Sequence, residues 1–110
     1  MGKLGFVYIL MNKGGSVLYV GVTHDLTKRL RQHRTGTGSR FVKRYKVHRL
    51  VYFEAYRDIR EAIAREKQIK GWRRSRKEEL ILTMNPRLRD LSEEAGHMQS
   101  ELNLGISVQF

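Results

Sequence analysis

The sequence predicts an α/β domain of the α+β type, in which a small three-stranded antiparallel sheet is flanked by helices. Two runs of β-branched and aromatic residues, Phe6–Asn12 and Val17–Val22, are separated by the turn residues KGGS, a pattern typical of a β-hairpin. Two strands joined by so short a loop must run antiparallel. A third run of the same kind covers Val47–Tyr56. Helical segments between and after these runs give the order strand–strand–helix–strand–helix–helix.

Both hairpin strands are apolar at nearly every position, so we expect both faces of the sheet to be covered. Tyr8 lies in the first strand and Tyr19 in the second. If the loop has an even number of residues, Tyr8 pairs directly with Tyr19; if the number is odd, the two rings lie on opposite faces. Both are also compatible with ordinary strand aromatics. Gly21 lies on the same side of its strand as Tyr19, and its missing side chain would let a phosphate or another backbone approach.

The first predicted helix covers Leu26–Arg34 and begins at one of two capping residues, Thr23 or Asp25. The loop TGTGSR follows it. Phe41–Tyr45 then forms either a short helical turn or an ordered basic loop before the third strand.

Two further helices follow the third strand. Asp58 is expected to cap a long helix that ends near Gly71. Ser75 and Glu78 have the spacing of a capping box, which predicts the start of the last helix. The dipeptide Asn85-Pro86 ends it.

The charge balance indicates a polyanionic partner. The chain has 110 residues, which suits one domain, and its 22 Lys and Arg against 11 Asp and Glu give a net charge of +11. Nucleic acid is the first candidate and an acidic membrane surface the second. The chain contains no cysteine, which excludes disulfides and thiolate metal sites and fits the reducing cytoplasm. No stretch is apolar enough to cross a membrane, and the apolar run near the N-terminus has the pattern of a strand rather than of a signal peptide.

The composition changes near residue 90. Residues 91–110 contain three glutamates and neither lysine nor arginine, whereas the preceding part carries all 22 lysines and arginines. We therefore expect a working domain at 1–90 and an acidic C-terminal tail at 91–110. The tail is either flexible or folded back over the basic surface.

The long helix contains one acidic residue where an apolar side chain is expected. At about 100° per residue, Ile59, Ala62, Ile63 and Ile69 define a buried stripe, and Glu66 falls inside it. A carboxylate in such a stripe is costly unless it is paired or bound to a metal. Glu66 is therefore either a stripe-edge residue that reaches water or an arginine, or a ligand for a divalent cation.

The first helix shows a similar feature. Arg29 and His33 lie next to the seam formed by Leu26 and Leu30 rather than opposite to it. Their i, i+4 spacing makes their side chains neighbours. One interpretation is an arginine whose stem covers apolar surface beside a packed histidine. The other is a pair of polar groups directed at a shared site.

These residues form an ordered set that resembles the GIY-YIG nuclease family, and in particular its small single-domain bacterial members, the YhbQ-like (URI-domain) proteins. The set consists of Val7-Tyr8, Tyr19-Val20-Gly21, the later Arg29, Glu66 in REKQIKGW, and Asn85 before proline. The resemblance covers roughly residues 4–90. It implies the fold predicted above and a role for Asn85 in bracing the site.

Two departures accompany this resemblance. The first motif is Phe6-Val7-Tyr8, without the leading glycine, and the second has Val20 where isoleucine is usual. Neither change removes a chemical group. The chain also lacks the additional recognition domain that many members carry, which leaves the substrate open.

The resemblance implies hydrolysis of phosphodiester bonds with one divalent cation, Mg²⁺ or Mn²⁺, bound by Glu66. It further implies that Arg29 stabilises charge on the phosphate and that Tyr8 or Tyr19 orients the attacking water or accepts its proton. His33 is expected to assist by hydrogen bonding to a tyrosine or to the phosphate.

The remaining positive charge is expected to bind the nucleic-acid backbone, with DNA favoured over RNA and shape favoured over sequence. Phe41, Tyr45 and Trp72 are able to stack on bases if they are exposed, although a core position is also expected for Trp72. The oligomeric state is left open. The expected nucleic-acid contacts are Gly21, Arg40, Lys43, Arg44, Lys46, Lys70, Arg73 and Arg74, with Arg76 and Lys77 as further candidates.

Three functions are compatible with these features. The first is a metal-dependent endonuclease that acts on DNA and selects its structure rather than its sequence. The second is a non-catalytic DNA- or RNA-binding module that keeps the fold. The third is a basic structural protein, attached for example to a ribosome or an acidic membrane, in which Arg29 and Glu66 serve folding only.

Overall fold

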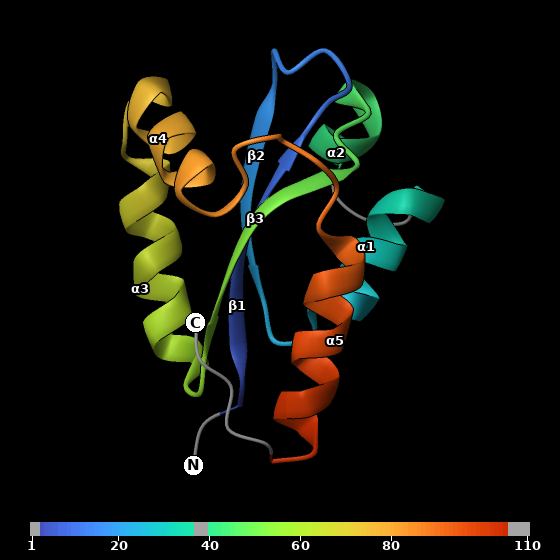
Figure 1. The fold of residues 1–110 in the computed structure, drawn as a ribbon, viewed down its shortest axis with the longest axis vertical. Helices are drawn as coiled ribbons and strands as arrows, with labels where there is room; N and C mark the ends of the chain where they lie inside the picture. The colour runs from blue at the N-terminus through green and yellow to red at the C-terminus, as the bar shows by residue number, and fades with distance from the viewer. Residues whose placement is uncertain (1–2, 37–39, 106–110) are drawn as a thin grey trace.

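A computed structural model of the chain describes residues 3–36 and 40–105. Three antiparallel strands, β1 (Gly5–Met11), β2 (Leu18–Thr23) and β3 (Arg49–Tyr56), form one sheet in the order β2-β1-β3 (Figure 1). The predicted fold class is therefore confirmed. The helices are α1 (Leu26–Thr35), α2 (Arg40–Tyr45), α3 (Ile59–Lys70), α4 (Arg74–Met84) and α5 (Ser92–Asn103). None of these helices has the length and apolarity needed to span a bilayer.

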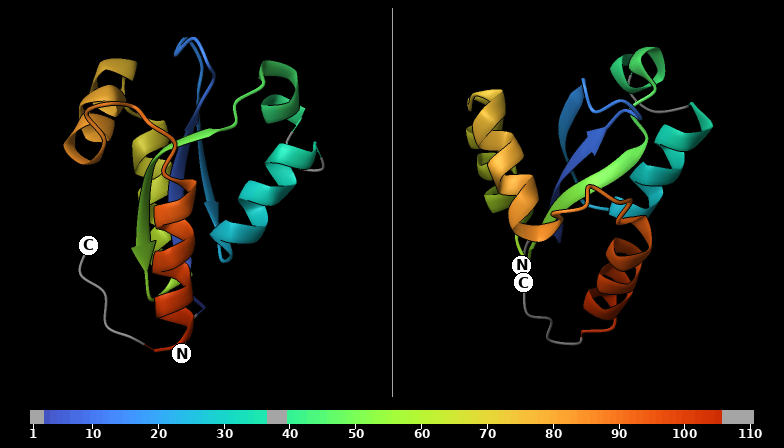
Figure 2. Two further views of the ribbon diagram at one scale, coloured as in Figure 1. Left: turned by 45° about the vertical axis from the view of Figure 1, so that its right-hand side comes forward. Right: turned by 45° about the horizontal axis from the view of Figure 1, so that its top comes forward.

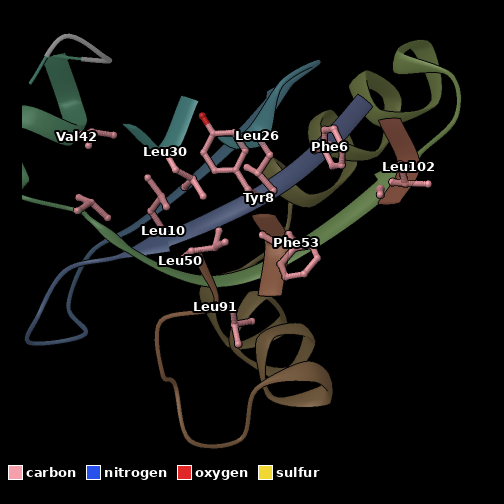
Figure 3. Packing of buried hydrophobic residues seen from close by; sticks show 13 residues of the cluster. Phe6, Tyr8, Leu10, Leu26, Leu30, Val42, Leu50, Phe53, Leu91 and Leu102 are labelled. Atoms are coloured by element: carbon pink, nitrogen blue, oxygen red, sulfur yellow. The ribbon is translucent and has the colours of Figure 1, made fainter. Parts of the chain in front are cut away.

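Helices cover both faces of the sheet, as the apolar strands predict. In Figure 1, α3 and α4 lie on one side of the sheet, and α1, α2 and α5 lie on the other. Alternate residues of β1 enter two separate cores because successive side chains of a strand point to opposite faces. Phe6, Tyr8 and Leu10 face α1 and α5 (Figure 3), whereas Val7 and Ile9 face α3 and α4.

The hairpin register decides the relation between the two tyrosines. Tyr8 pairs with Gly21, and Tyr19 pairs with Leu10. Because paired residues share a face, Tyr8 and Tyr19 lie on the same face, as an even loop predicts. The direct pairing that we expected is wrong, however, and the two rings are diagonal neighbours.

Two of the three helices for which we predicted a capping residue begin at a predicted cap. The Asp25 carboxylate accepts a hydrogen bond from the Lys28 amide, and Asp58 does the same for Arg60. The predicted capping box is wrong, because α4 begins at Arg74 and places Ser75 inside the helix. For Phe41–Tyr45 the sequence predicts either a short helical turn or an ordered basic loop, and the structure shows a helix, α2.

The separation of a domain at 1–90 from a tail at 91–110 does not match the described residues. Helix α5 packs beside α1 (Figure 2), and Leu91, Ala95 and Leu102 are buried in the same core as β1. The side chain of Gln99 accepts a hydrogen bond from the Thr27 amide. Residues up to 105 therefore belong to the domain, because its hydrophobic core is completed by α5. The end of the expected tail, 106–110, lies outside the described residues.

Candidate active site

Three polar rings meet between β1, β2 and α1. The Tyr8 hydroxyl and Nε2 of His33 are 3.1 Å apart, and this is the hydrogen bond to a tyrosine that we expected of His33. The Tyr19 ring centroid lies 6.2 Å from that of Tyr8 and 5.8 Å from that of His33, in an edge-on arrangement with the latter. The hairpin supplies the two phenols and α1 supplies the imidazole, so the cluster depends on the packing of α1 against the sheet.

Gly21 makes this cluster possible in a different way from the one predicted. A Cβ atom placed on Gly21 would lie 2.4 Å from Cζ of Tyr8. The space that we expected a phosphate or another backbone to use is therefore filled by the Tyr8 ring. The assignment of Gly21 as a nucleic-acid contact is wrong, since the tyrosine covers it.

Burial separates the cluster into an inner and an outer part. Tyr8 is fully buried and His33 is 2% exposed, whereas Tyr19 and Arg29 are partly exposed. Burial, with a smaller contribution from Tyr19, raises the pKa of Tyr8 well above its usual value. Tyr8 therefore keeps its proton in this arrangement and presents no surface to a substrate, so Tyr19 is the phenol that is better placed for contact with a substrate.

His33 is neutral for the same reason. Burial, reinforced by the positive charge of Arg29, lowers the pKa of His33 to about 4. Its Nδ1 atom is buried and has no hydrogen-bond partner among the described residues. Buried N–H groups without an acceptor are rarer than buried acceptors without a donor, which favours the tautomer that carries its proton on Nε2. In that tautomer His33 donates to the Tyr8 oxygen and fixes the orientation of the phenol.

Arg29 connects this buried pair to the surface. Its charge acts on the pKa values of both Tyr8 and His33, so the guanidinium lies close to both side chains. Arg29 is half-buried on α1, and with Thr23 and Gln32 it lines a small surface pocket of about 70 Å³. Arg29 and Tyr19 are therefore the members of this group that a substrate is able to reach.

Glu66 lies on α3, which covers the other face of the sheet. Ala62 and Ile69 are fully buried, and Arg65 on one flank of that line bonds Glu54 of β3. Arg65 and Glu66 are consecutive residues and lie about 100° apart around the axis of α3. Glu66 therefore occupies the opposite flank of the helix, toward β2. Its side chain is 12% exposed. The carboxylate and the phenol cluster therefore lie against opposite faces of the sheet, on either side of β2.

The first alternative weighed for Glu66, a stripe-edge residue with a basic partner, matches the structure in part, and the second, a ligand for a divalent cation, stays a prediction. Its carboxylate pairs with Lys70 at 3.2 Å, so the basic partner is a lysine one turn later rather than an arginine. Ile63, which was expected in the buried stripe, is 37% exposed. The stripe is thus narrower than predicted, and Glu66 lies at its covered edge.

The fit of a metal ion can be judged from these donors. Mg²⁺ is commonly held by one or two carboxylates together with waters and substrate phosphates. No group of three or more His, Cys, Asp or Glu side chains among residues 3–36 and 40–105 is placed to hold an ion. Glu66 therefore fits a divalent cation that is shared with a substrate phosphate, and does not fit one that is held by protein groups alone.

A second inward carboxylate, Glu54, was missed from the sequence. Arg65 donates to it through Nε and Nη2, and the hydroxyls of Tyr52 and Tyr56 donate to its two oxygens. Burial raises the pKa of Glu54, but these hydrogen bonds outweigh burial and hold the pKa below its usual range. Because its oxygens already accept bonds from three side chains, Glu54 is a structural ion-pair residue. The alternation Tyr-Phe-Glu-Ala-Tyr in β3 was the signal that could have revealed it.

Asn85 and Arg74 have structural partners. Asn85 is buried, donates to the backbone carbonyls of Val51 and Arg89 and accepts from the Arg89 amide. It stabilises the chain between α4 and α5 against β3, and the bracing of the site that we expected of it stays a prediction. Arg74 donates to the carbonyls of Gly15 and Ser16 in the hairpin loop and pairs with Glu78. These bonds hold Arg74 against the hairpin loop, and its role as a nucleic-acid contact stays a prediction.

The other predicted cationic contacts lie in two groups on the surface. The first group is carried by α2 and the residue that follows it, beside the phenol cluster. The second group lies near the α3–α4 junction, around Lys70 and Arg73. All of these residues are exposed: Arg40, Lys43, Arg44 and Lys46 in the first group, and Lys70 and Arg73 in the second.

The sheet order, helices α1 and α3 on its two faces, and the motif residues together define a class of protein, the GIY-YIG catalytic domains. The model of the GIY-YIG catalytic domain matches residues 4–79, and the chain belongs to this family. It is similar to a UPF0213 protein of Clostridium perfringens, with 37% identity over 101 residues that cover 92% of this chain and 100% of that protein. A UPF0213 protein of Bacillus pumilus is 35% identical over 92 residues, which cover 84% and 88% of the two chains.

A solved structure agrees with this assignment. The solution NMR structure of a UPF0213 protein from Bacillus halodurans matches with a TM-score of 0.51 and 32% sequence identity. The match covers 76% of this chain and 88% of that chain. The predicted family is thus confirmed by sequence and by structure.

Proposed function

We propose that the protein is a metal-dependent endonuclease that hydrolyses phosphodiester bonds in DNA and selects the structure of the DNA rather than its sequence. The observation that carries the proposal is the assembly of three motif residues, Tyr8, Tyr19 and Arg29, into one cluster beside the free edge of β2. Membership of the GIY-YIG family and the net charge of +11 support it.

The proposed site lies along the outer edge of β2. β2 is an edge strand among the described residues, with Arg29 on the α1 side and Glu66 on the α3 side. A phosphodiester that passes along this edge would meet a guanidinium on one side and a carboxylate on the other. A divalent cation held by Glu66 would neutralise charge on the phosphate and on the departing oxygen.

The residues of the chain then have distinct roles. Arg29 donates to the non-bridging oxygens of the phosphate and stabilises their growing charge. Tyr19, whose side chain is partly exposed, orients the attacking water through its hydroxyl. Tyr8 and His33 are positioning residues, because their burial keeps them from the substrate. Their hydrogen bond fixes the orientation of the buried side chains that lie beneath Tyr19 and Arg29.

A cleavage assay on a panel of single-stranded, duplex and branched DNA and RNA with Mg²⁺ or Mn²⁺ tests this function. Glu66→Gln removes the charge but keeps the volume, and we expect cleavage to fall on the order of 10²-fold or more. Glu61→Gln is the matched control, because Glu61 is an exposed glutamate on the same helix. If wild type and Glu66→Gln release product at the same rate, the cleavage comes from a contaminant and the proposal fails.

The second candidate is a non-catalytic DNA- or RNA-binding module. It is favoured by the ion pair between Glu66 and Lys70, which gives the carboxylate a partner without a metal. This candidate predicts salt-sensitive binding that does not depend on metal, and no cleavage of any substrate in the panel.

A further inference from the structure

A row of aromatic rings leads from the buried phenol to the surface. The Tyr19 ring lies 6.2 Å from that of Tyr8 and 5.7 Å from that of Phe41, measured between centroids. Phe41 in turn lies 4.7 Å from Tyr45. The last two rings belong to α2, so this short helix extends the phenol cluster outward.

The outer end of the row is unusually exposed for aromatic side chains. Phe41 is 40% exposed and Tyr45 is 43% exposed, side by side on one helix. Large apolar side chains are ordinarily buried, and a contiguous exposed group of them often marks a binding surface. The guanidinium of Arg44 lies 5.6 Å from the Tyr45 ring centroid. Arg40, Lys43 and Lys46 are exposed on the same segment.

We propose that Phe41 and Tyr45 form a stacking platform for unpaired nucleobases of the substrate, next to the bond that is cut. Aromatic rings inside a basic surface bind single strands because every base has a face that stacks, while cations hold the phosphates between the bases. The bases of an intact duplex are already stacked on each other and leave no face for the platform. This inference rests on the proposed function and names its substrate class: DNA with a single-stranded segment at the cleavage point.

Other exposed or partly exposed aromatics are less suited to this role. The Trp72 ring has the guanidinium of Arg76 4.0 Å from its centroid and that of Arg65 at 5.1 Å, and it packs against the core on the α3 side. Tyr52 and Tyr56 donate to Glu54. The rings of α2 are therefore the ones that combine exposure, basic neighbours and contact with Tyr19.

Binding measurements on matched DNAs test the platform. Phe41→Leu and Tyr45→Leu keep apolar volume but remove the ring, and each should weaken binding of a single-stranded oligonucleotide about tenfold. Binding of a duplex of the same length should stay within about twofold. Lys43→Gln should weaken both ligands equally, and Leu82→Ala should change neither, because Leu82 is an equally exposed apolar residue on α4. Equal losses for single strand and duplex in the two ring variants would overturn the proposal.

Photo-cross-linking of the wild-type protein provides a readout that does not depend on the stability of the variants. With an iodouracil-substituted single strand, we expect cross-linked peptides from 40–46 and not from the peptide that contains Trp72. Cross-links at Trp72 alone would overturn the platform. The two proposals fail separately: cleavage that depends on Glu66 without any selectivity of the ring variants removes the platform only. Selective binding at α2 without cleavage removes the nuclease and keeps the platform only as a binding site for single strands.

Discussion

The ring of Tyr8 lies directly against Gly21, so closely that a Cβ atom on Gly21 would stand 2.5 Å from the Tyr8 hydroxyl oxygen. The two residues are paired across β1 and β2. That oxygen is the atom that bonds to His33. A glycine in the second motif therefore acts on the site through the tyrosine of the first motif, by leaving room for its ring.

Gly21→Ala should consequently displace Tyr8. Adding a methyl group to a filled core forces side chains out of their preferred positions, and we expect a loss of about 1–3 kcal/mol in the free energy of unfolding. Gly14→Ala is the control, because a Cβ atom on Gly14 meets nothing within 4 Å. Urea unfolding of both variants measures the difference. Equal stability of the two would show that the Tyr8 ring is able to move aside without cost.

Replacing each tyrosine by phenylalanine should separate the positioning role from the contact role. Tyr8→Phe removes the hydrogen-bond partner of His33 Nε2 in a buried place, which we expect to cost about 1–3 kcal/mol of stability. Tyr19→Phe removes the hydroxyl of a partly exposed residue and should change stability by less than about 0.5 kcal/mol. Cleavage should fall in both variants. A stable Tyr8→Phe protein together with a destabilised Tyr19→Phe protein would reverse the two assignments.

The parts of the fold that the sequence predicted are those with local signals. The hairpin, the third strand and the caps Asp25 and Asp58 each depend on a few neighbouring residues. Helix α5 was missed because its glutamates and Gly96 disguised it as an acidic tail. Leu91, Ala95 and Leu102 nevertheless recur on one helical face and are buried. This pattern indicates a buried helix only once the apolar surface beside α1, against which it packs, is known.

The candidate site was predictable in composition but not in arrangement. The motif order selected Tyr8, Tyr19 and Arg29, the helical spacing added His33, and the structure brings these side chains together. Which of the phenols is buried depends on the strand register and on the packing of α1, and neither is written in local spacing. The placement of Glu66 across β2 depends on which face α3 covers, which is likewise a property of the whole fold.

His33 should make the stability of the protein depend on pH in a defined window. Its pKa is lowered from 6.5 to about 4, chiefly by burial and then by Arg29, so the unfolded chain binds a proton more readily than the folded one. The contribution of neutral His33 to the free energy of unfolding is fully present above pH 6.5 and is lost as the pH falls toward 4. We expect a loss of roughly 3 kcal/mol at most over this range.

Thermal unfolding at several pH values checks this expectation. His33→Gln should flatten the pH dependence between about 6.5 and 4.5. His24→Gln is the control, because His24 is exposed, and it should keep the slope of the wild type. Because the pKa of Glu54 is lowered, the protein also loses stability when this carboxylate is protonated. That loss begins only below the usual pKa of a glutamate, so it falls outside the window of His33. An unchanged slope in His33→Gln would assign the dependence to other groups.

The ion pair between Glu54 of β3 and Arg65 of α3 should contribute far more to stability than the ion pairs on the surface. Arg65 and Glu54 are 3.0 Å apart, with side-chain exposures of 25% and 16%. Arg65→Met would leave the Glu54 carboxylate partly buried without its cation, and we expect a loss of about 2 kcal/mol, less than for a fully buried pair. The double variant with Glu54→Gln should recover part of this loss, because the uncompensated charge is then gone. Arg60→Met is the control: Arg60 bonds Asp58, but its side chain is 83% exposed, so stability should not change measurably. A double-mutant cycle by urea unfolding that shows no coupling between Glu54 and Arg65 would contradict this account of the pair.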